Sequence, residues 1–545
     1  MGSGRSKIVS LAEAAALIPD EATVSVSSSS GLGCPDAMLR AIGERFRETG
    51  GPRNLTTIHP IAAGDMYGIA GIDHIAEPGL LKRVIAGSYP SGPSSMPSPK
   101  IWEMIHENQI EAYNIPSGIL FHMHVDTAAK RPGVLTRVGI DTFVDPRQSG
   151  GRMNECTTED IVEVVQFDGQ EWLYFRAISI DVAIIRGTTG DEFGNISMEH
   201  EGAYLGALDQ ALAARNNGGI VIAQVKRTTA RGAIPTQQVR IPGNLVDYVV
   251  VDTEQLQTTL THYDPAISGE IRATLDSFAP VEWGTDKVIA RRAAMELVNG
   301  DAVNLGFGIS ALVPRVLLEE GHGDHVTWAI EQGAVGGVPL LGFAFGCAAN
   351  AMGIMPSPMQ FVYFQGGGFD RTFLSFLQVG ADGSVNVSKL AAKPHVTAGV
   401  GGFIDITANA RNIVFGGYLT AGAIDLAIVD GRLEIRREGK VRKFVAEVEQ
   451  ITFSGRMALE RGAKVTYVTE RCVLELRSDG LTVIEIAPGI DLVRDVLGQV
   501  DFPLTVAADL KVMDDQLFRP ELMGLELKSR AVGEWSSREV GRVPL

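Results

Sequence analysis

Cysteine is scarce in this sequence of 545 residues, which contains only four scattered copies. They form no Cys-x-x-Cys pair and no spacing typical of zinc ligands. Such usage is typical of a reduced protein that depends on neither disulfides nor structural zinc. The first residues, MGSGRSKIVSL, also lack the long apolar segment of a secretory signal. Together these absences predict a cytoplasmic protein.

Long uninterrupted apolar runs are absent as well. Residues 332–369 form a stretch of 38 residues without a charged side chain. Glycine and proline interrupt this stretch throughout, so it contains no apolar run of the ~18 residues that a transmembrane helix needs. We therefore expect a buried, loop-rich segment here and no membrane association.

Basic residues are fewer than acidic ones, 48 against 65, which gives a net charge of −17. A nucleic-acid-binding surface needs Lys and Arg to replace phosphate counterions, so the composition argues against nucleic acid as a partner. The acidic composition does not exclude a small anionic ligand, because such a ligand needs only a local cluster of basic residues. The ten histidines do not cluster as metal ligands. His122 and His124 alternate in an expected strand or loop, where packing or solvation is the commoner role, and we expect no bound metal.

Short β-branched runs alternate with helical periods along the whole chain. Strands separated by helices predict parallel sheets covered on both faces, so the expected fold class is α/β. The clearest strand candidates are Thr23–Val26, Ile220–Val225, Tyr248–Val251 and Ile413–Phe415.

The order of local signals occurs twice, about 280 residues apart. The first copy runs from a capping box at Ser10 and Glu13 through a helix, a strand, a Gly-x-Gly loop at 31–33, Pro35 and a second helix. The second copy runs from a helix after Asp286 through a strand at 301–305, the loop 306–308, Pro314 and another helix. A second pair of similar segments, 191–197 and 382–388, is also found, and each is predicted to be a turn that leads into a strand. Chance reuse of turns is the alternative.

We interpret the repeat as two related, open α/β domains fused in one chain, residues 1–285 and 286–545. The junction is expected within 268–285, where Pro280 and Gly284 break the pattern. The loop 306–308 alone is weak evidence for a dinucleotide site, because no ribose-binding acid follows at the expected distance.

Glu331 is the most informative acid, because it is the last charge before the uncharged stretch 332–369. A carboxylate at a strand end, beside glycines and apolar surface, is poorly solvated, which raises its pKa and its nucleophilicity. The alternative is a glutamate with a structural role only, as a helix cap or in a salt bridge. The glycine-rich segments 365–370 and 399–405 could hold an oxyanion or phosphate with bare backbone N–H groups, or could be tight turns only.

Taken in order, these segments resemble the family I CoA-transferases of the single-chain acetate/propionate type. The resemblance covers nearly the whole chain. Further segments that carry it are Gly139–Pro146, Asn216–Gly219, Arg240–Gly243, Asn386–Ser388, Thr469–Arg471 and Glu485–Asp491. It implies an α-subunit-like domain over 1–285 and a β-subunit-like domain over 286–545, the second one carrying the nucleophile.

The family places a nucleophilic glutamate in a Glu-x-Gly-x-x-Gly-Gly segment, which here is 331–337. The resemblance therefore implies ping-pong transfer of CoA from an acyl-CoA to a carboxylic acid through a glutamyl-CoA thioester on Glu331. Coenzyme A is then a substrate, and no permanently bound cofactor or metal is needed. The chain is expected to act in acyl-CoA and short-chain fatty acid metabolism as a homo-oligomer, a tetramer or dimer.

The family's oxyanion donors map onto Gly402, through its backbone N–H, and onto Ser117, which replaces the usual and longer glutamine. The expected CoA-binding residues are Gly366, Gly367, Gly368, Lys389 and Gly401. The segments 87–92 and 341–346 depart from the family pattern by losing charge and bulk, which predicts a larger or more apolar acid than acetate. An acyl-CoA hydrolase and a catalytically weak acyl-CoA-binding protein are the alternative functions.

Overall fold

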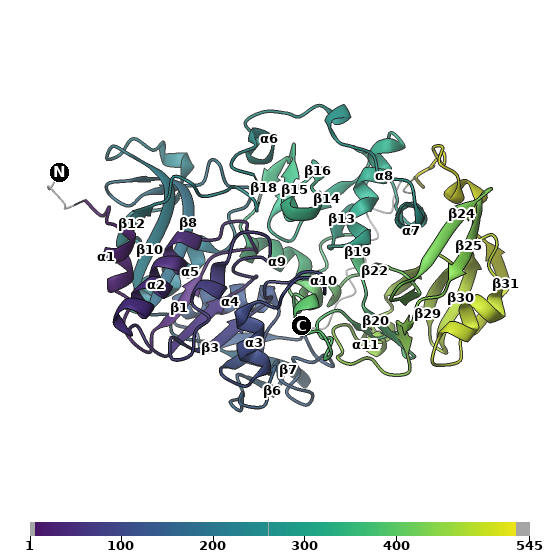
Figure 1. Cartoon of the computed structure of the whole chain (residues 1–545), viewed down its shortest axis with the longest axis horizontal. Helices are drawn as coiled ribbons and strands as arrows, with labels where there is room; N and C mark the ends of the chain where they lie inside the picture. The colour runs from purple at the N-terminus through teal and green to yellow at the C-terminus, as the bar shows by residue number, and fades with distance from the viewer. Residues whose placement is uncertain (1–5, 260, 530–545) are drawn as a thin grey trace.

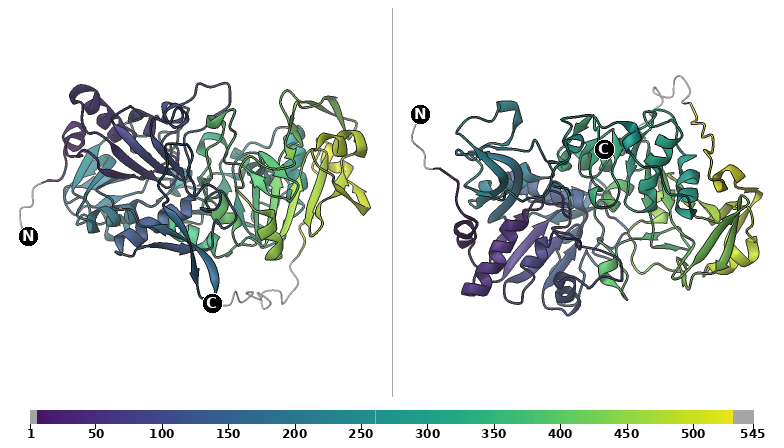
Figure 2. Two further views of the ribbon diagram at one scale, coloured as in Figure 1. Left: turned by 90° about the horizontal axis from the view of Figure 1, so that it is seen from below. Right: turned by 45° about the horizontal axis from the view of Figure 1, so that its top comes forward.

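The computed structural model describes residues 6–259 and 261–529, and two large sheets dominate it. Figure 1 shows the first sheet with the N-terminal half of the chain and the second with the C-terminal half, side by side along the long axis. We call the part from helix α1 to strand β12 the first unit, and the part from α7 to β31 the second unit. Figure 2 shows the same side-by-side arrangement from two further directions.

The first sheet has seven parallel strands in the order β12-β10-β8-β1-β2-β3-β4, with a short antiparallel extension, β9-β11. The strands are β1 (Thr23–Val26), β2 (Leu55–His59), β3 (Leu81–Ala86), β4 (Glu111–Asn114), β8 (Val182–Asp191), β9 (Ile196–Ser197), β10 (Ile220–Thr229), β11 (Val239–Ile241) and β12 (Tyr248–Val251). A separate antiparallel sheet contains β5 (Gly133–Thr136), β6 (Val162–Phe167) and β7 (Gln170–Arg176).

Successive residues of β8 belong alternately to two buried clusters, which shows that helices cover both faces of the first sheet. Ala183 and Ile185 belong to one buried cluster, which also contains residues of α4 (Ser117–Ala128) and α5 (Ala207–Asn216). Their neighbours Val182 and Ile184 belong to another, which contains residues of α1 (Leu11–Ala16), α2 (Asp36–Thr49) and α3 (Lys100–His106). Successive side chains of a strand point to opposite faces, so the helices form a layer on each side.

The second sheet is parallel at its centre, in the order β14-β13-β19-β22-β28. The pairs β18-β15-β14 on one side and β28-β29-β30 on the other are antiparallel, and the last pair, β30-β31, is parallel again. Its strands are β13 (Ala302–Leu305), β14 (Thr327–Ala329), β15 (Ala334–Val335), β18 (Gly353–Ile354), β19 (Arg371–Ser375), β22 (Asn412–Gly416), β28 (Lys464–Val468), β29 (Cys472–Arg477), β30 (Gly480–Ile486) and β31 (Thr505–Val512). Helices of this unit are α7 (Thr285–Ala294), α8 (Val313–Glu319), α9 (Ser357–Gln365), α10 (Phe403–Thr407) and α11 (Gly455–Glu460), and α6 (Pro265–Ser268) precedes them.

Small sheets, antiparallel except for one parallel pair, β20 with β27, complete the second unit. They pair β16 (Val338–Pro339) with β17 (Ala348–Ala349), β20 (Gln378–Gly380) with β21 (Val385–Asn386) and β27 (Phe444–Val445), β23 (Thr420–Ala421) with β26 (Val441–Arg442), and β24 (Asp425–Val429) with β25 (Arg432–Arg437).

The two sheets repeat one topology, which confirms the prediction of two related α/β folds. The five strands β12-β10-β8-β1-β2 of the first correspond in position and chain order to β28-β22-β19-β13-β14 of the second. The second pair of similar segments also has a structural counterpart, because β9 and β21 both return antiparallel after a turn. Ser10 forms the predicted capping box, in which its Oγ accepts the Glu13 N–H.

The expected strand or loop around His122 and His124 is wrong, since both residues lie on α4. The segment is surrounded by buried apolar residues at helical spacing, which a two-residue alternation of histidines conceals. His124 is buried and packs as expected, with Nδ1 2.7 Å from the Leu120 carbonyl and Nε2 2.8 Å from Ser25 Oγ on β1. Within the described ranges, no helix combines the length and apolarity needed to cross a bilayer.

Candidate active site at the junction of the two sheets

The carboxyl ends of the parallel strands bring the candidate residues together. Open α/β sheets bind ligands at this edge, because the loops that leave the strands gather there. In the first unit, β3 leads to Gly87 and β4 to Ser117; in the second, β14 leads to Glu331. The Ser117 N–H donates to the Gly401 carbonyl (2.8 Å), and the Gly401 N–H donates to the Gly87 carbonyl (2.7 Å). The candidate site therefore lies between the two units.

Glu331 stands at a tight hairpin that connects β14 to β15. The Ile330 N–H donates to the Ala334 carbonyl (2.8 Å) and closes the turn. Gly333 has φ +121°, and a Cβ there would lie 2.0 Å from the Met355 carbonyl oxygen. Gly336 and Gly337, with φ +69° and +73°, also occupy the left-handed region. The Glu-x-Gly-x-x-Gly-Gly spacing is thus required by the backbone that positions Glu331.

The environment of the Glu331 carboxyl disfavours its charge, as the sequence predicts. Desolvation raises its pKa to about 8, the negative charge of Asp405 adds to this rise, and the Gly402 N–H opposes it. The residue is neither fully buried nor fully exposed, so it is still accessible to a substrate. A carboxylate that is this poorly solvated is a stronger nucleophile than one in water.

Gly402 contacts the Glu331 carboxyl directly. A Cβ at position 402 would lie 2.8 Å from Glu331 Cδ and 2.8 Å from Phe361 Cε1, which leaves no room for any side chain. Gly401 has φ +51°, and its Cβ position is 3.8 Å from Glu331 Oε1. The structure therefore brings together three of the predicted site residues, with the Gly402 N–H directed at the carboxyl.

Ser117 lies next to this group as the first residue of α4. It is completely buried, and within the described parts of the chain its Oγ has no hydrogen-bond partner. A Cβ on Gly87 would approach this Oγ to 2.5 Å, so Gly87 is a close-contact position. A buried hydroxyl without a partner is costly unless a ligand or water satisfies it.

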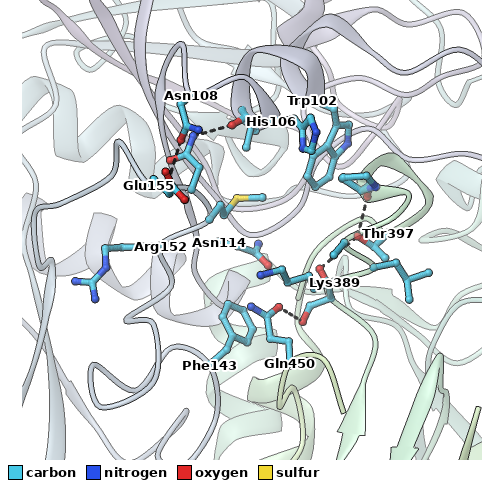
Figure 3. Close-up of a pocket in the computed structure, with 17 residues that line it drawn as sticks. Trp102, His106, Asn108, Asn114, Phe143, Arg152, Glu155, Lys389, Thr397 and Gln450 are labelled. Carbon is cyan, nitrogen blue, oxygen red and sulfur yellow. Dashed lines mark hydrogen bonds between the residues drawn. The ribbon is translucent and has the colours of Figure 1, made fainter. Parts of the chain in front are cut away.

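The remaining predicted residues lie farther apart. Gly366, Gly367 and Gly368 form the turn after α9, where the atoms nearest to their Cβ positions belong to Val362, Tyr363 and Asn409. Lys389 lines a different feature, a cavity of about 290 Å³ between the two units. Figure 3 shows Lys389 in this cavity with Trp102, His106, Arg152 and Gln450. Asn114 belongs to its lining and also accepts the Val400 N–H (2.9 Å), which places the cavity beside the glycine loop 399–402.

Aromatic side chains gather near the residue that follows Glu331. A Cβ on Gly346 would lie 2.9 Å from Cδ of Gln332, so the segment 341–346 runs beside the hairpin. Phe343 of this segment meets Tyr67 of the first unit in an edge-to-face contact, with ring centroids 4.5 Å apart. Phe345 makes a similar contact with Phe307 at 5.4 Å. The loss of charge predicted for 341–346 is thus accompanied by exposed aromatic surface.

Sequence reasoning missed Asp405, and it gave the loop 306–308 only as weak evidence for a dinucleotide site. Asp405, which ends the predicted glycine segment 399–405, is fully buried and interacts with Glu331; an acid at the end of a glycine-rich loop was the available signal. The loop 306–308 lies at the switch point of the second sheet, between β13 and β19, where the chain connections diverge and ligands commonly bind. Within 6–259 and 261–529, no group of three His, Cys, Asp or Glu residues could hold a metal ion.

Comparison with known proteins yields matches along nearly the whole chain. Residues 8–252 match the family model for coenzyme A transferase. The acetate CoA-transferase YdiF of Escherichia coli K12 is 42% identical over 97% of this chain and 98% of its own. The caffeate CoA-transferase of Acetobacterium woodii is 41% identical over 96% of this chain and 99% of its own. The crystal structure of the acyl-CoA transferase YdiF from E. coli O157:H7, a thioester complex with CoA, superposes with a TM-score of 0.88 at 40% identity, covering 96% and 98% of the two chains.

Proposed function

The chain belongs to the coenzyme A transferase family, and from this premise we propose that it moves CoA between carboxylic acids by a ping-pong reaction on Glu331. The family gives the enzyme class. The observation that carries the mechanism is the Glu331 carboxyl, whose pKa is raised to about 8 and which receives the Gly402 N–H. The similar protein from E. coli O157:H7 is described as a thioester complex with CoA, which supports a covalent route.

In the first half-reaction, a Glu331 carboxylate oxygen attacks the thioester carbonyl of an acyl-CoA. The C–S bond breaks, and CoA leaves as a thiolate from an acyl-glutamyl anhydride. The thiolate then attacks the Glu331 Cδ, so that the acyl group departs as a free carboxylate and a glutamyl-CoA thioester remains. A second carboxylate reverses both steps and leaves with CoA. The thioester energy is conserved, because water takes part in neither half.

Two groups are proposed to stabilise the oxyanions of these steps. The Gly402 N–H already points at the Glu331 carboxyl, and a fixed backbone donor needs no reorganisation during the reaction. Ser117 is proposed as the second donor, because its buried Oγ is free of partners in the described structure and it is bonded through its N–H to the same glycine loop. A bound oxyanion would satisfy this hydroxyl.

For the binding of CoA, the cavity beside the loop 399–402 favours Lys389, which lines it. Gly401 lies next to the Glu331 carboxyl and stays a prediction for CoA binding. A lysine at the edge of the cavity suits the phosphates of CoA. The turn 366–368 stays a prediction, as do the homo-oligomeric assembly and the cytoplasmic location.

The acid is proposed to be larger or more apolar than acetate. The two relatives are named for acetate and for caffeate, a small and a large acid. Here the aromatic rings of Phe343 and Tyr67 meet beside the Glu331 hairpin and provide apolar contact surface for the larger class.

The test is intact mass spectrometry after incubation with a panel of acyl-CoAs from acetyl-CoA to aromatic acyl-CoAs, followed by borohydride reduction and peptide mapping. We expect a CoA adduct, and after reduction a modified Glu331, with the longer or aromatic donors giving most adduct. The Glu331→Gln variant should give none while still binding acyl-CoA. Free acid released in many equivalents per enzyme without an added acceptor, and no adduct from any donor, would instead identify a hydrolase.

A further inference from the structure

Asp405 is a buried acid that the proposed reaction does not use. It lies in the first turn of α10 with no exposed surface. One carboxylate oxygen accepts the Gly118 N–H of the first unit (2.9 Å), and the other accepts from Gln365 Nε2 on α9 (2.8 Å). The Ile119 N–H contributes as well, so the carboxylate sits at the N-terminus of the 12-residue helix α4. Helix N-termini favour negative charge.

These donors give Asp405 a structural link to the site. Gly118 follows Ser117, whose own N–H binds the Gly401 carbonyl. The first turn of α4 is therefore held to α10 by Asp405 and to the glycine loop by Ser117. A Cβ on Gly118 would lie 2.5 Å from an Asp405 oxygen, which shows how closely the two helices approach.

Gly402, whose N–H meets the Glu331 carboxyl, is the N-cap of α10, and Asp405 lies in the first turn of that helix, three residues later. The Phe361 ring packs against both groups, 2.8 Å from the Cβ position of Gly402 and 2.7 Å from that of Gly118. Within the described part of the chain, Asp405 is also the charged group that acts on Glu331.

The other titratable groups on the packed elements have different partners: on α4, His122 faces the Pro358 carbonyl and His124 faces Ser25. From α11, Arg461 donates to the Thr407 carbonyl at the end of α10. Tyr363 on α9 takes part in ring contacts. The half-buried Glu331 and the fully buried Asp405 thus act on each other, and none of these contacts places a cation between them.

We propose that Asp405 is a positioning residue that destabilises the free Glu331 carboxylate relative to the covalent glutamyl-CoA thioester, and so drives the accumulation of that intermediate. This inference depends on the proposed function. In thioester formation, the negative charge of Glu331 leaves with the released carboxylate, and the glutamyl thioester is neutral. The repulsion from Asp405 therefore acts on the free enzyme and disappears in the intermediate.

The same charge has an effect on the pH dependence. The pKa of Glu331 is raised to about 8, so the reactive carboxylate forms only as the pH rises through that value. Burial also raises the pKa of Asp405 to about 7, and the N–H donors counteract this, so both carboxyls are mainly ionised at a pH of about 9. Removing the Asp405 charge must lower the pKa of Glu331 and shift the acidic limb of the first half-reaction to lower pH.

The experiment compares the wild-type enzyme with Asp405→Asn, which keeps the size of the side chain and an oxygen that accepts from Gly118. Each protein is equilibrated with a fixed ratio of acyl-CoA to free acid, and the thioester fraction is measured by intact mass. At a pH of about 9, where Glu331 is mainly ionised, we expect the ratio of thioester to free enzyme to fall about tenfold in the variant, the change that one pKa unit represents. The acidic limb of its thioester-formation rate should move to lower pH.

Asp209→Asn is the matched control, because burial raises the pKa of Asp209 to about 6 while it lies on α5 and acts on neither acid. This control should change neither the ratio nor the limb. Gln365→Met removes a donor that partly neutralises the Asp405 carboxylate and leaves its charge in place. At this pH it should therefore raise the ratio, by a smaller factor than Asp405→Asn lowers it. Gln365→Met also tests the effect of Asp405 on the ratio if Asp405→Asn does not fold.

The outcomes separate this inference from the proposed function. A wild-type enzyme that forms no thioester would overturn the proposed function. A wild-type enzyme that forms the thioester, with a ratio and an acidic limb that Asp405→Asn and Gln365→Met leave unchanged, would overturn the role of Asp405. A loss of activity with unchanged ratio and limb would reduce Asp405 to a structural residue.

Discussion

At the scale of single residues, the site depends on glycines, whose lack of a side chain leaves room for neighbouring groups. Gly402 has φ −89° and ψ 4°, a backbone that other residues also adopt. Its glycine is required by the contact with Glu331 and Phe361 and not by its own conformation. Gly333, by contrast, needs glycine for its positive φ as well as for space. Glycine is thus required at positions 402 and 333 for different physical reasons.

We predict that Gly402→Ala lowers the rate of CoA transfer by ~10²–10³-fold, the loss that removal of one oxyanion donor produces. The added methyl must displace either the Glu331 carboxyl or the glycine loop, and both displacements break the alignment of the Gly402 N–H. Steady-state kinetics and the rate of thioester formation measure the effect. Gly353→Ala in β18 is the control, because no atom lies within 4 Å of its Cβ position. Near-normal transfer by Gly402→Ala would remove Gly402 from the proposed oxyanion site.

At the scale of elements, the loop between β16 and β17 connects the Glu331 hairpin to the first unit. The Leu340 N–H donates to the Cys347 carbonyl (3.0 Å) and closes the base of this loop. Its tip carries Phe343, which contacts Tyr67 across the junction. Because the base is fixed by a short antiparallel pair and the tip is exposed, the loop can present different side chains to a substrate without altering the sheet that holds Glu331.

We predict that Phe343→Ala lowers kcat/KM for aromatic acids about tenfold and leaves that for acetate nearly unchanged, since a lost apolar contact weakens only the substrates that use it. Competition between an aromatic acid and acetate for the same acyl-CoA donor gives the ratio directly. Phe167→Ala in β6 is a suitable control, because this phenylalanine is 59% exposed and Phe343 is 45% exposed. An equal loss for both acids would show that Phe343 supports the fold of the loop and does not select the substrate.

At the scale of the whole molecule, the site is assembled from both units. The first unit supplies Ser117 and Gly118 at the N-terminus of α4, and the second supplies Glu331, Gly402 and Asp405. Phe121 of α4 and Phe361 of α9 pack between them, with ring centroids 5.6 Å apart. The largest buried cluster contains residues of both units, so the junction is part of the core. The division into an N-terminal domain, 1–285, and a C-terminal domain, 286–545, stays a prediction.

We therefore predict that a chain cut between Gly284 and Thr285, one residue before the proposed boundary, retains its activity when the halves are produced together. No atom lies within 4 Å of the Gly284 Cβ position, and α7 begins at Thr285, so the cut disturbs little packing. The halves should copurify and form the thioester, while each half alone should not. Thioester formation by the isolated C-terminal half would contradict a site shared between the units.

Much of this architecture is encoded locally. The capping box of Ser10 and Glu13, the β-branched strands and the glycine spacing of 331–337 each reflect the conformation of a few consecutive residues, so the sequence predicts them. The repeat of the sheet topology is visible in the same way, because the order of elements is a property of the chain. The poor solvation of Glu331 also follows from its uncharged neighbourhood in the sequence.

Contacts between distant segments are decided by the tertiary structure. The sequence by itself determined the α/β class and the duplication, and it singled out the acid that the proposed chemistry uses. Only the fold placed Asp405 at the N-terminus of α4, 287 residues away from its donor Gly118, and closed the cavity around Lys389 between the units. It also assigned His122 and His124 to a helix, against the alternation of the sequence. Local backbone preferences leave a periodic trace in the sequence, whereas the meeting of two sheets at their carboxyl ends depends on packing that no short segment contains.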